Sequence, residues 1–417
     1  MLVVVIACCL TVALGFLLKG RCLDPMAFAS GDQYRRLCYN DIQPLYGIRD
    51  VHTDTFPYIN AEFTGDFQYV NGGLEYPVLT GVFMWIAGLL VDDADSYLRV
   101  NALLMAPMAL VGAYLLARMA GWRALLYACA APIVWYAFHN WDVPSVAATI
   151  AGLWSWHRGR PLWAAVWFGL GAALKLHPIV FIVPLAFEGL QMGGRKEGVK
   201  RLGVGAGTAL AVNLPFMLIN YDGWWGTYEF HSLRPPNPDS MFALLGSRFP
   251  DISFFHMPTL NLTVAALTLA TFVVVLAYAW DKGRREAAYP FLQVCAAFLC
   301  AFMLWNKVFS PQYMLWLVPF FVVLNVHLLW WVAFIVIDAI CYSAIFRWLY
   351  DISYLGVDDT VAKTAMITGI WARAVLLAVL IVVFLRSRPA PDPEVSDARF
   401  FLSHPVSTVG EVGAAKA

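Results

Sequence analysis

Long apolar segments recur from one end of this chain to the other, and they constrain the fold more than any other feature. The first occupies residues 2–18, and several windows reach about 18 mostly apolar residues, enough for a helix to cross a bilayer. Charged residues make up only 13% of the chain, against about 25% in soluble domains. The strands of a membrane barrel would instead alternate apolar and polar residues. The sequence therefore predicts an all-α, polytopic membrane protein.

Hydropathy divides the chain into thirteen apolar segments. They occupy residues 2–18, 76–92, 98–117, 123–138, 142–156, 161–174, 177–191, 202–219, 259–280, 288–305, 312–326, 328–346 and 365–385. Some are too short to cross alone, so we expect about 11 to 13 transmembrane or re-entrant helices. Residues 2–18 lack the basic flank and the cleavage site of a signal peptide, so we interpret them as a retained first span.

Clusters of Lys and Arg indicate which ends of these segments are cytoplasmic. The strongest clusters lie at residues 157–160, 195–201, 282–285 and 386–388. This assigns to the outer face the turn at Lys175, the loop 220–258, the turn 307–312 and the loop 348–363. We expect one transmembrane domain over residues 1–388. The tail at 389–417 contains Pro, Ala and Ser, and we expect it to be disordered and cytoplasmic.

The N-terminal half leaves the topology open. If the polar loop 19–75 is also outside, the number of crossings between residues 76 and 156 does not match the charge rule. The match is restored if one segment is re-entrant, if two segments merge, or if Arg118 and Arg123 lie outside. The sequence does not choose among these three alternatives.

The longest polar run covers residues 38–81 and lies mostly in the loop 19–75. This loop holds eight carboxylates: Asp24, Asp32, Asp41, Asp50, Asp54, Glu62, Asp66 and Glu75. Loop carboxylates are mostly just solvated. Asp41 differs because it stands among aromatic and aliphatic residues near the end of the first span. A partly desolvated carboxylate has a raised pKa and can act as a general base. We therefore predict that Asp41 is the catalytic base.

The eight cysteines show no metal-ligand spacing, and we predict no metal site. Six lie in apolar segments and are interpreted as small core residues: Cys8, Cys9, Cys129, Cys295, Cys300 and Cys341. Cys22 and Cys38 share the first loop and could form a disulfide if that loop is extracytoplasmic, but their spacing does not decide this. The net charge is zero, so nothing points to a nucleic acid.

Cations and amides stand at the ends of several apolar segments. Lys175 could extend to the interface or contact a phosphate at membrane depth. His177 could assist it, although a single histidine is more often structural, and Asp142 fits a functional role and a structural pairing equally well. Further along the chain, the same kinds of side chain recur at His231, Arg234, Lys307, Gln312 and Tyr313. Because an arginine fork binds phosphate, these residues favour a phosphate- or sugar-binding face with one acid.

Several short motifs together resemble a known family. They are Asp41-Ile42-Gln43-Pro44-Leu45-Tyr46, Pro57-Tyr58, Glu75-Tyr76-Pro77, Leu174-Lys175-Leu176-His177-Pro178, Asp239-Ser240-Met241 and Gln312-Tyr313. In this layout the chain resembles the family 87 glycosyltransferases of the C-type superfamily. These are actinobacterial enzymes that use polyprenyl-phosphate sugars, and they include arabinofuranosyltransferases and mannosyltransferases of mycobacterial envelope synthesis.

The resemblance implies a C-type architecture with a large first extracytoplasmic loop. It places Asp41 at the position of the catalytic base and Lys175 near the donor phosphate. It implies a membrane enzyme that moves arabinofuranose or mannose, with inversion, from a polyprenyl-phosphate donor to a cell-envelope glycan or glycolipid. No cofactor is expected besides that donor. The residues expected to bind the donor are Tyr46, Tyr76, Lys175, His177, His231, Arg234, Lys307, Gln312 and Tyr313.

Two other classes of protein stay open. A lipid or polysaccharide transporter often shows inverted repeats and broken helices. We find no repeat, and the polar groups are predicted to cluster on one face, which favours an enzyme. A non-catalytic scaffold of an envelope assembly would need no base at Asp41.

Overall fold

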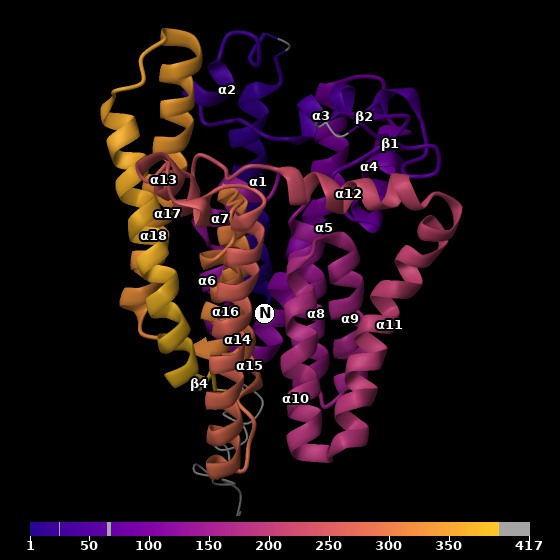
Figure 1. The fold of residues 1–417 in the computed structure, drawn as a ribbon, viewed down its shortest axis with the longest axis vertical. Coiled ribbons are helices and arrows are strands. Elements are labelled where there is room, and N and C mark those ends of the chain that lie inside the picture. Colours follow the sequence, from indigo (N-terminus) through magenta and orange to yellow (C-terminus); the bar gives the residue numbers. More distant parts are fainter. Residues whose placement is uncertain (25, 65–67, 392–417) are drawn as a thin grey trace, which may run out of the picture.

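Long apolar helices run along the long axis of the molecule in a computed structural model that describes residues 1–24, 26–64 and 68–391 (Figure 1). Within these residues, six helices are long and apolar enough to cross a membrane. They are α1 (Leu2–Lys19), α5 (Ala94–Ala120), α11 (Arg195–Ile219), α14 (Thr259–Glu286), α17 (Leu328–Tyr350) and α18 (Val361–Arg386). The predicted all-α, polytopic fold class is confirmed. Most of the tail predicted to be disordered lies outside the described residues.

Shorter apolar helices fill the space between the long ones. They are α6 (Leu125–Ala128), α7 (Ala131–Tyr136), α8 (Val143–His157), α9 (Pro161–Leu174), α10 (Ile182–Gly193), α15 (Phe291–Leu304) and α16 (Met314–Val323). At about 1.5 Å per residue, even the longest of them spans only about 22 Å, less than the roughly 30 Å of a bilayer core. They pack against long neighbours, α9 on α11 and α15 on α18. In a bilayer that the long helices cross, a short helix that begins at the basic end would therefore end below the outer surface.

A cap of loops and short helices covers the upper end of the bundle (Figure 1). It contains α2 (Asp32–Arg35), α3 (Ile42–Ile48), α4 (Val78–Gly88), α12 (Tyr221–Leu233), α13 (Met241–Arg248) and the antiparallel pair β1 (Glu62–Phe63) and β2 (Tyr69–Val70). The helix α12 is fastened across the first loop. The Asn220 side chain caps it and donates to Tyr58 O and Ala61 O at 3.1 and 2.9 Å. A Cβ on Gly223 would come within 2.7 Å of both carbonyls, so only glycine allows this close approach.

The helix α4 explains why the number of crossings predicted in the N-terminal half did not match the charge rule. The first loop holds both ends of the segment 76–92: Tyr58 donates to Tyr76 O at 2.9 Å, and Tyr46 donates to Val91 O at 3.0 Å. Both ends of this segment therefore lie on the cap side, which favours the re-entrant alternative. Arg123 lies at the other end of the bundle, where it donates to the carbonyls of Val322 and Leu324.

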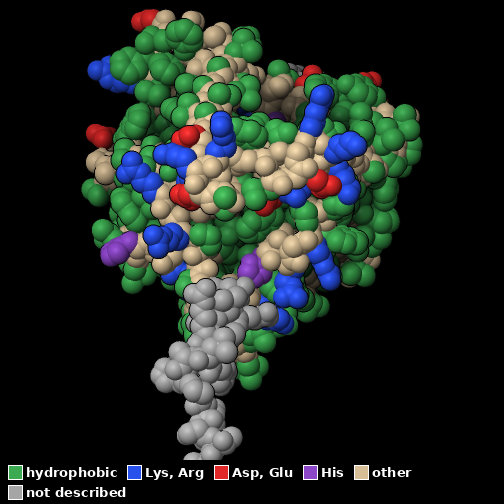
Figure 2. Space-filling model, turned by 90° about the horizontal axis from the view of Figure 1, so that it is seen from below, with side chains coloured by type: hydrophobic (Ala, Val, Ile, Leu, Met, Phe, Trp, Pro, Cys, Tyr) green, Lys and Arg blue, Asp and Glu red, His purple; other side chains and the backbone are tan. Residues whose placement is uncertain are grey.

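Basic side chains gather at the end of the bundle opposite the cap (Figure 2). They follow the turn after α8, the start of α11, the end of α14 and the end of α18, which are the four clusters marked in the sequence. There, β3 (Leu324–Asn325) pairs with β4 (Arg388–Pro389). The polar loops and the basic turns thus occupy opposite ends, as the charge rule predicts for the two faces of a membrane protein.

A disulfide joins Cys22 to Cys38, with the two Cα atoms 5.6 Å apart. It ties the end of α1 to the chain just before α3, close to Asp41. The alternative left open by the sequence is therefore decided in favour of the bond. Of the other six cysteines, four are buried, but Cys9 and Cys129 are exposed. The expectation of a core position was wrong for these two. Cys9 lies on the outer face of α1, and Cys129 lies in the turn after α6.

The disulfide gives a test of pairing and orientation together. In intact cells, a membrane-impermeant maleimide should not label Cys22 or Cys38 until a membrane-impermeant reductant has been added, and should then label both. The C22S/C38S variant is the control for labelling of the exposed Cys9 and Cys129. Labelling that requires permeabilised cells would place the cap on the cytoplasmic side, and labelling without reductant would show that the bond is absent.

Candidate functional site

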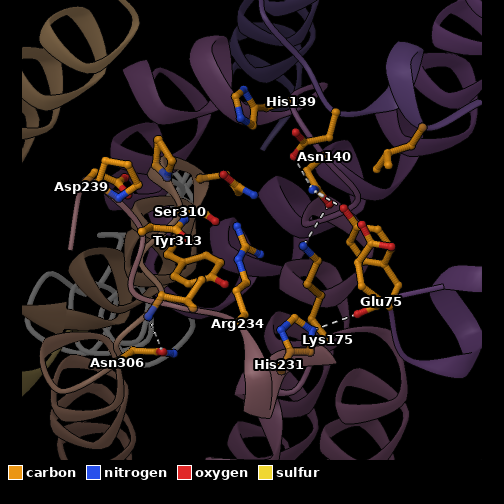
Figure 3. A pocket seen from close by; sticks show the side chains of 18 of the residues that line it. Glu75, His139, Asn140, Lys175, His231, Arg234, Asp239, Asn306, Ser310 and Tyr313 are labelled. Atoms are coloured by element: carbon orange, nitrogen blue, oxygen red, sulfur yellow. Dashed lines mark hydrogen bonds between the residues drawn. The ribbon is translucent and has the colours of Figure 1, made fainter. Parts of the chain in front are cut away.

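A cavity of about 940 Å³ lies beneath the cap, where the short helices end. Volumes of this order are typical of sites for small molecules. The first loop, the turns before α8 and after α9, the end of α12, the turn after α15 and one face of α17 all line it (Figure 3). Nine of the ten residues predicted for the site border this one cavity: Asp41, Tyr76, Lys175, His177, His231, Arg234, Lys307, Gln312 and Tyr313.

Tyr46 is the exception. Its hydroxyl donates to Val91 O at 3.0 Å, and its ring packs on Tyr97 with the centroids 4.9 Å apart. The side chain is buried away from the cavity, on the opposite side of α3 from Asp41. The structure does not place Tyr46 with the other residues predicted to bind the donor: its hydroxyl instead fastens the first loop to the chain after α4.

Asp41 is the residue before the first turn of α3. Its backbone N–H donates to His139 O at 2.8 Å. One carboxylate oxygen accepts a hydrogen bond from the Tyr39 hydroxyl at 2.9 Å, and the other accepts one from Asn140 Nδ2 at 2.6 Å. Burial raises the pKa of Asp41 above the usual aspartate range, although these two hydrogen bonds and the charges of Lys175 and Arg234 oppose the shift. The result is an oriented carboxylate with increased basicity.

Asn140 connects the carboxylate to a buried cation. Its Nδ2 donates to Asp41 and lies 2.8 Å from the Tyr76 hydroxyl, while its Oδ1 accepts from Lys175 Nζ at 3.0 Å. The sequence analysis did not single out Asn140. The available signal was its place in the polar turn 139–142 between two apolar segments, where only Asp142 was considered.

Lys175 ends α9 in an extended conformation. Its Nζ lies 3.1 Å from Asp142 Oδ2, and the other oxygen of that fully buried carboxylate accepts from Trp316 Nε1 at 2.8 Å. The sequence allowed a functional role or a structural pairing for Asp142, and the structure shows the pairing. Lys175 does not extend to the interface, because its amine points into this network. Its charge still borders the cavity.

Lys175→Met should destabilise the protein by about 3–5 kcal/mol, because it leaves the buried Asp142 carboxylate without a counter-ion. The double variant Lys175→Met/Asp142→Asn should recover much of that loss, since no buried charge then remains. Thermal unfolding in detergent would measure both effects, and a double-mutant cycle would give the coupling. Additive losses would contradict the pairing.

Arg234 projects into the middle of the cavity from the end of α12 (Figure 3). Among the described residues its guanidinium has no hydrogen bond or ion pair, and its nearest interaction is with the Phe230 ring at 5.9 Å. The chain continues through Pro235, Pro236 and Pro238, which keep it extended. Asn237 fastens this stretch to the next turn by donating to Phe309 O at 3.2 Å. Arg234 is thus a cation on a fixed support, open to a ligand.

Lys307 and His231, which were predicted to bind the donor, instead form hydrogen bonds within the wall of the cavity. Lys307 Nζ donates to Ser232 O at 2.9 Å, and burial lowers its pKa to about 8. His231 Nε2 donates to Glu75 O at 2.9 Å, and burial lowers its pKa below the usual histidine range. The Glu75 carboxylate also pairs with Arg49 at 2.6 Å. Both predicted residues line the cavity, but Lys307 Nζ and His231 Nε2 are hydrogen-bonded to backbone carbonyls of the protein.

A stack of three rings forms another part of the wall. Trp316 lies between His177 and Tyr313, with both pairs of centroids 4.0 Å apart. Asp239, which the sequence analysis used only as part of a motif, borders the same cavity, and burial raises its pKa to about 6. Among the described residues, no three or more His, Cys, Asp or Glu side chains come close enough together to hold a metal ion.

A family model matches much of this architecture. The model of glycosyltransferase family 87 matches residues 74–311, which is more than half of the chain. The matched range includes Asn140, Lys175 and Arg234 but begins after Asp41. A search of curated proteins found no match. Because the family model spans the greater part of the chain and the helices form a multi-pass bundle, this protein belongs to glycosyltransferase family 87 and is a membrane glycosyltransferase.

Proposed function

We propose that the protein transfers one arabinofuranose or mannose unit from a polyprenyl-phosphate donor to a hydroxyl group of a cell-envelope glycan or glycolipid. The reaction takes place on the extracytoplasmic face, in the cavity beneath the cap. The observation that carries this proposal is that two side chains border one cavity: Asp41, an oriented carboxylate, and Arg234, whose guanidinium has no hydrogen bond or ion pair among the described residues.

The position of Arg234 supports a role in binding the donor phosphate. A planar guanidinium can make two parallel hydrogen bonds to phosphate oxygens. Negative charge increases on the leaving phosphate as the bond to the sugar breaks, and cations fixed in advance stabilise that charge most in a site shielded from water. Lys175 adds a second positive charge, although its amine is hydrogen-bonded to Asn140 and Asp142.

The surroundings of the cavity suit a lipid-linked substrate. Leu176 and Ile179 follow Lys175 at the upper end of the short helix α9, and they remain 39% and 47% exposed. Leu176 also lines the cavity. Because this turn would lie below the outer surface of a bilayer that the long helices cross, an isoprenoid chain in the bilayer can contact these side chains while its phosphate reaches Arg234.

The transfer then needs one base and no general acid. Asp41 accepts the proton of the acceptor hydroxyl, whose oxygen forms a bond to the anomeric carbon. The bond between that carbon and the phosphate oxygen breaks, and polyprenyl phosphate leaves with the electron pair. Attack from the side opposite the phosphate inverts the anomeric centre. The proton remains on Asp41 until solvent removes it after product release.

The pH dependence follows from the direction of the Asp41 pKa. A base acts only when deprotonated, so the rate should fall as pH decreases through the Asp41 pKa. Because burial raises this pKa, the acid limb of kcat/KM should lie above the ordinary value of about 3.9. A profile of the purified enzyme would measure it. A limb that persists in the residual activity of Asp41→Asn would assign it to another group.

A transfer assay tests the proposal directly. Purified protein in nanodiscs would receive decaprenyl-phosphate arabinose and polyprenyl-phosphate mannose in parallel, with synthetic alkyl arabinofuranosides and mannosides as acceptors. We expect release of polyprenyl phosphate and a product larger by one sugar with one of the two donors. No turnover with either donor would reject the proposed reaction. Movement of labelled donor across a liposome membrane without product would favour the transporter alternative.

A further inference from the structure

Three side chains that line the cavity have buried polar atoms without a hydrogen-bond partner in the described part of the chain. These atoms are Asp239 Oδ2, Gln312 Oε1 and both ring nitrogens of His177. The three residues are only 5%, 3% and 1% exposed. The other buried unpartnered polar atoms found in the described part of the chain belong to side chains that do not line the cavity. Three of the ten described residues with such atoms therefore line the one cavity in which a ligand would lie.

Such atoms are costly in a protein that uses them only for structure. A buried polar group without a hydrogen bond costs about 1–3 kcal/mol, and most buried polar groups have a partner. At functional sites this cost is retained because the ligand supplies the missing hydrogen bonds. A carboxylate oxygen and an amide oxygen are acceptors, and neutral histidine offers one acceptor and one donor. The complementary ligand is therefore a small molecule with several adjacent hydroxyl groups.

The three side chains are held in place by groups that leave those atoms free. Arg373 donates a hydrogen bond to the backbone carbonyl of Asp239 and not to its carboxylate. The His177 ring is fixed by its stack on Trp316. Gln312 belongs to a single 3₁₀ turn, η6 (Pro311–Tyr313), which begins with a proline. The acceptor atoms are thus positioned before a ligand arrives, which reduces the entropy lost on binding.

The position of these three side chains relative to Arg234 indicates which part of the substrate the side chains face. Asp239 follows Arg234 along the proline-rich stretch, and Figure 3 shows both side chains at the same cavity. The positive charges of Arg373 and, less strongly, Arg234 also act on the Asp239 carboxylate. In a polyprenyl-phosphate sugar, the ring is attached directly to the phosphate. Groups beside the phosphate ligand are therefore near the hydroxyls of the transferred sugar.

We propose that Asp239, Gln312 and His177 form a subsite that recognises the hydroxyl groups of the transferred sugar and selects the donor. This inference rests on the proposed function, since it takes Arg234 as the phosphate ligand. A site that hydrogen-bonds a substrate hydroxyl rejects an analogue without it, because its own buried groups would remain unpaired. Selection should therefore depend on individual hydroxyls of the donor.

The test combines donor binding with transfer. Polyprenyl-phosphate mannose, decaprenyl-phosphate arabinose and the monodeoxy analogues of each would be offered to the wild type and to Asp239→Asn, Gln312→Met and His177→Phe. Phenylalanine keeps the ring stacked on Trp316 but removes both nitrogens. Each variant should weaken binding of the full donor by about ten- to a hundred-fold. Each should also lose the discrimination against one deoxy analogue that the wild type shows.

Stability separates this role from a structural one. Gln312→Met removes a buried unpartnered oxygen, so its unfolding temperature should stay the same or rise while donor binding weakens. Gln191→Met is the matched control, because Gln191 also has an unpartnered Oε1 but donates to Trp280 O at 2.8 Å, near the basic end of the bundle. It should leave donor binding unchanged.

The outcomes distinguish the subsite from the reaction. Unchanged discrimination among deoxy donors in all three variants would overturn the subsite, as would altered discrimination among acceptors alone. If the wild type binds and discriminates donors, and the variants lose this, but no sugar is transferred, the subsite stands and the proposed reaction fails. Absence of any donor binding by the wild type would overturn both.

Discussion

Replacing Asp41 with Asn is expected to reduce transfer by about 10²- to 10⁴-fold, the contribution of a positioned general base, without preventing folding. The amide oxygen can still accept the hydrogen bond from Tyr39, and the side chain keeps its size. It cannot take a proton from the acceptor hydroxyl. Donor binding, measured with labelled polyprenyl-phosphate sugar, should change little because the phosphate contact at Arg234 remains.

The matched control is Asp50→Asn, which removes a carboxylate from the same loop outside the cavity. Asp50 has a φ of 53°, a conformation that asparagine tolerates well, so neither folding nor transfer should suffer. The two variants would be compared in initial rate, donor affinity and unfolding temperature. Transfer by Asp41→Asn at the wild-type rate would show that Asp41 is not the base.

Arg234→Gln is expected to lower kcat by about 10²- to 10³-fold, the usual effect of removing one donor that stabilises developing charge. Glutamine retains some hydrogen bonding but supplies no charge to the leaving phosphate. Arg234→Lys should recover only part of the rate, because an ammonium group lacks the planar fork that matches a phosphate. Because Arg234 has no protein partner among the described residues, its removal should leave the unfolding temperature nearly unchanged.

The comparison with Arg248→Gln controls for charge alone. Arg248 ends α13 and packs on the Phe249 ring at 5.5 Å, in the same cap but outside the cavity. Rates and donor affinities would be measured for both variants over a range of salt concentrations. Equal losses in the two would indicate a general electrostatic effect of the cap instead of a specific phosphate contact.

Helix positions were predictable where the signal for a helix end and the apolar run beside it agree. The segment 161–174 coincides with α9, because Pro161 suits the first turn of a helix and an uninterrupted apolar run follows it. The basic clusters marked one end of the bundle for the same local reason. The segment 76–92 shows the limit, since its composition suits a span, yet Tyr46 and Tyr58 hold both of its ends at the cap.

The residues of the cavity likewise differ in how far the sequence could predict their roles. The sequence by itself determined that the chain is a helical membrane protein. It predicted Asp41 as the base and gave Arg234 as one of nine residues that could bind the donor, because hydropathy, charge and residue type are local properties. Only the tertiary structure decided their partners. Asn140 meets Asp41 across 99 positions of the chain, and Lys175 pairs with Asp142 in place of a surface position. Such contacts depend on which helix ends meet in space, and no local pattern records that.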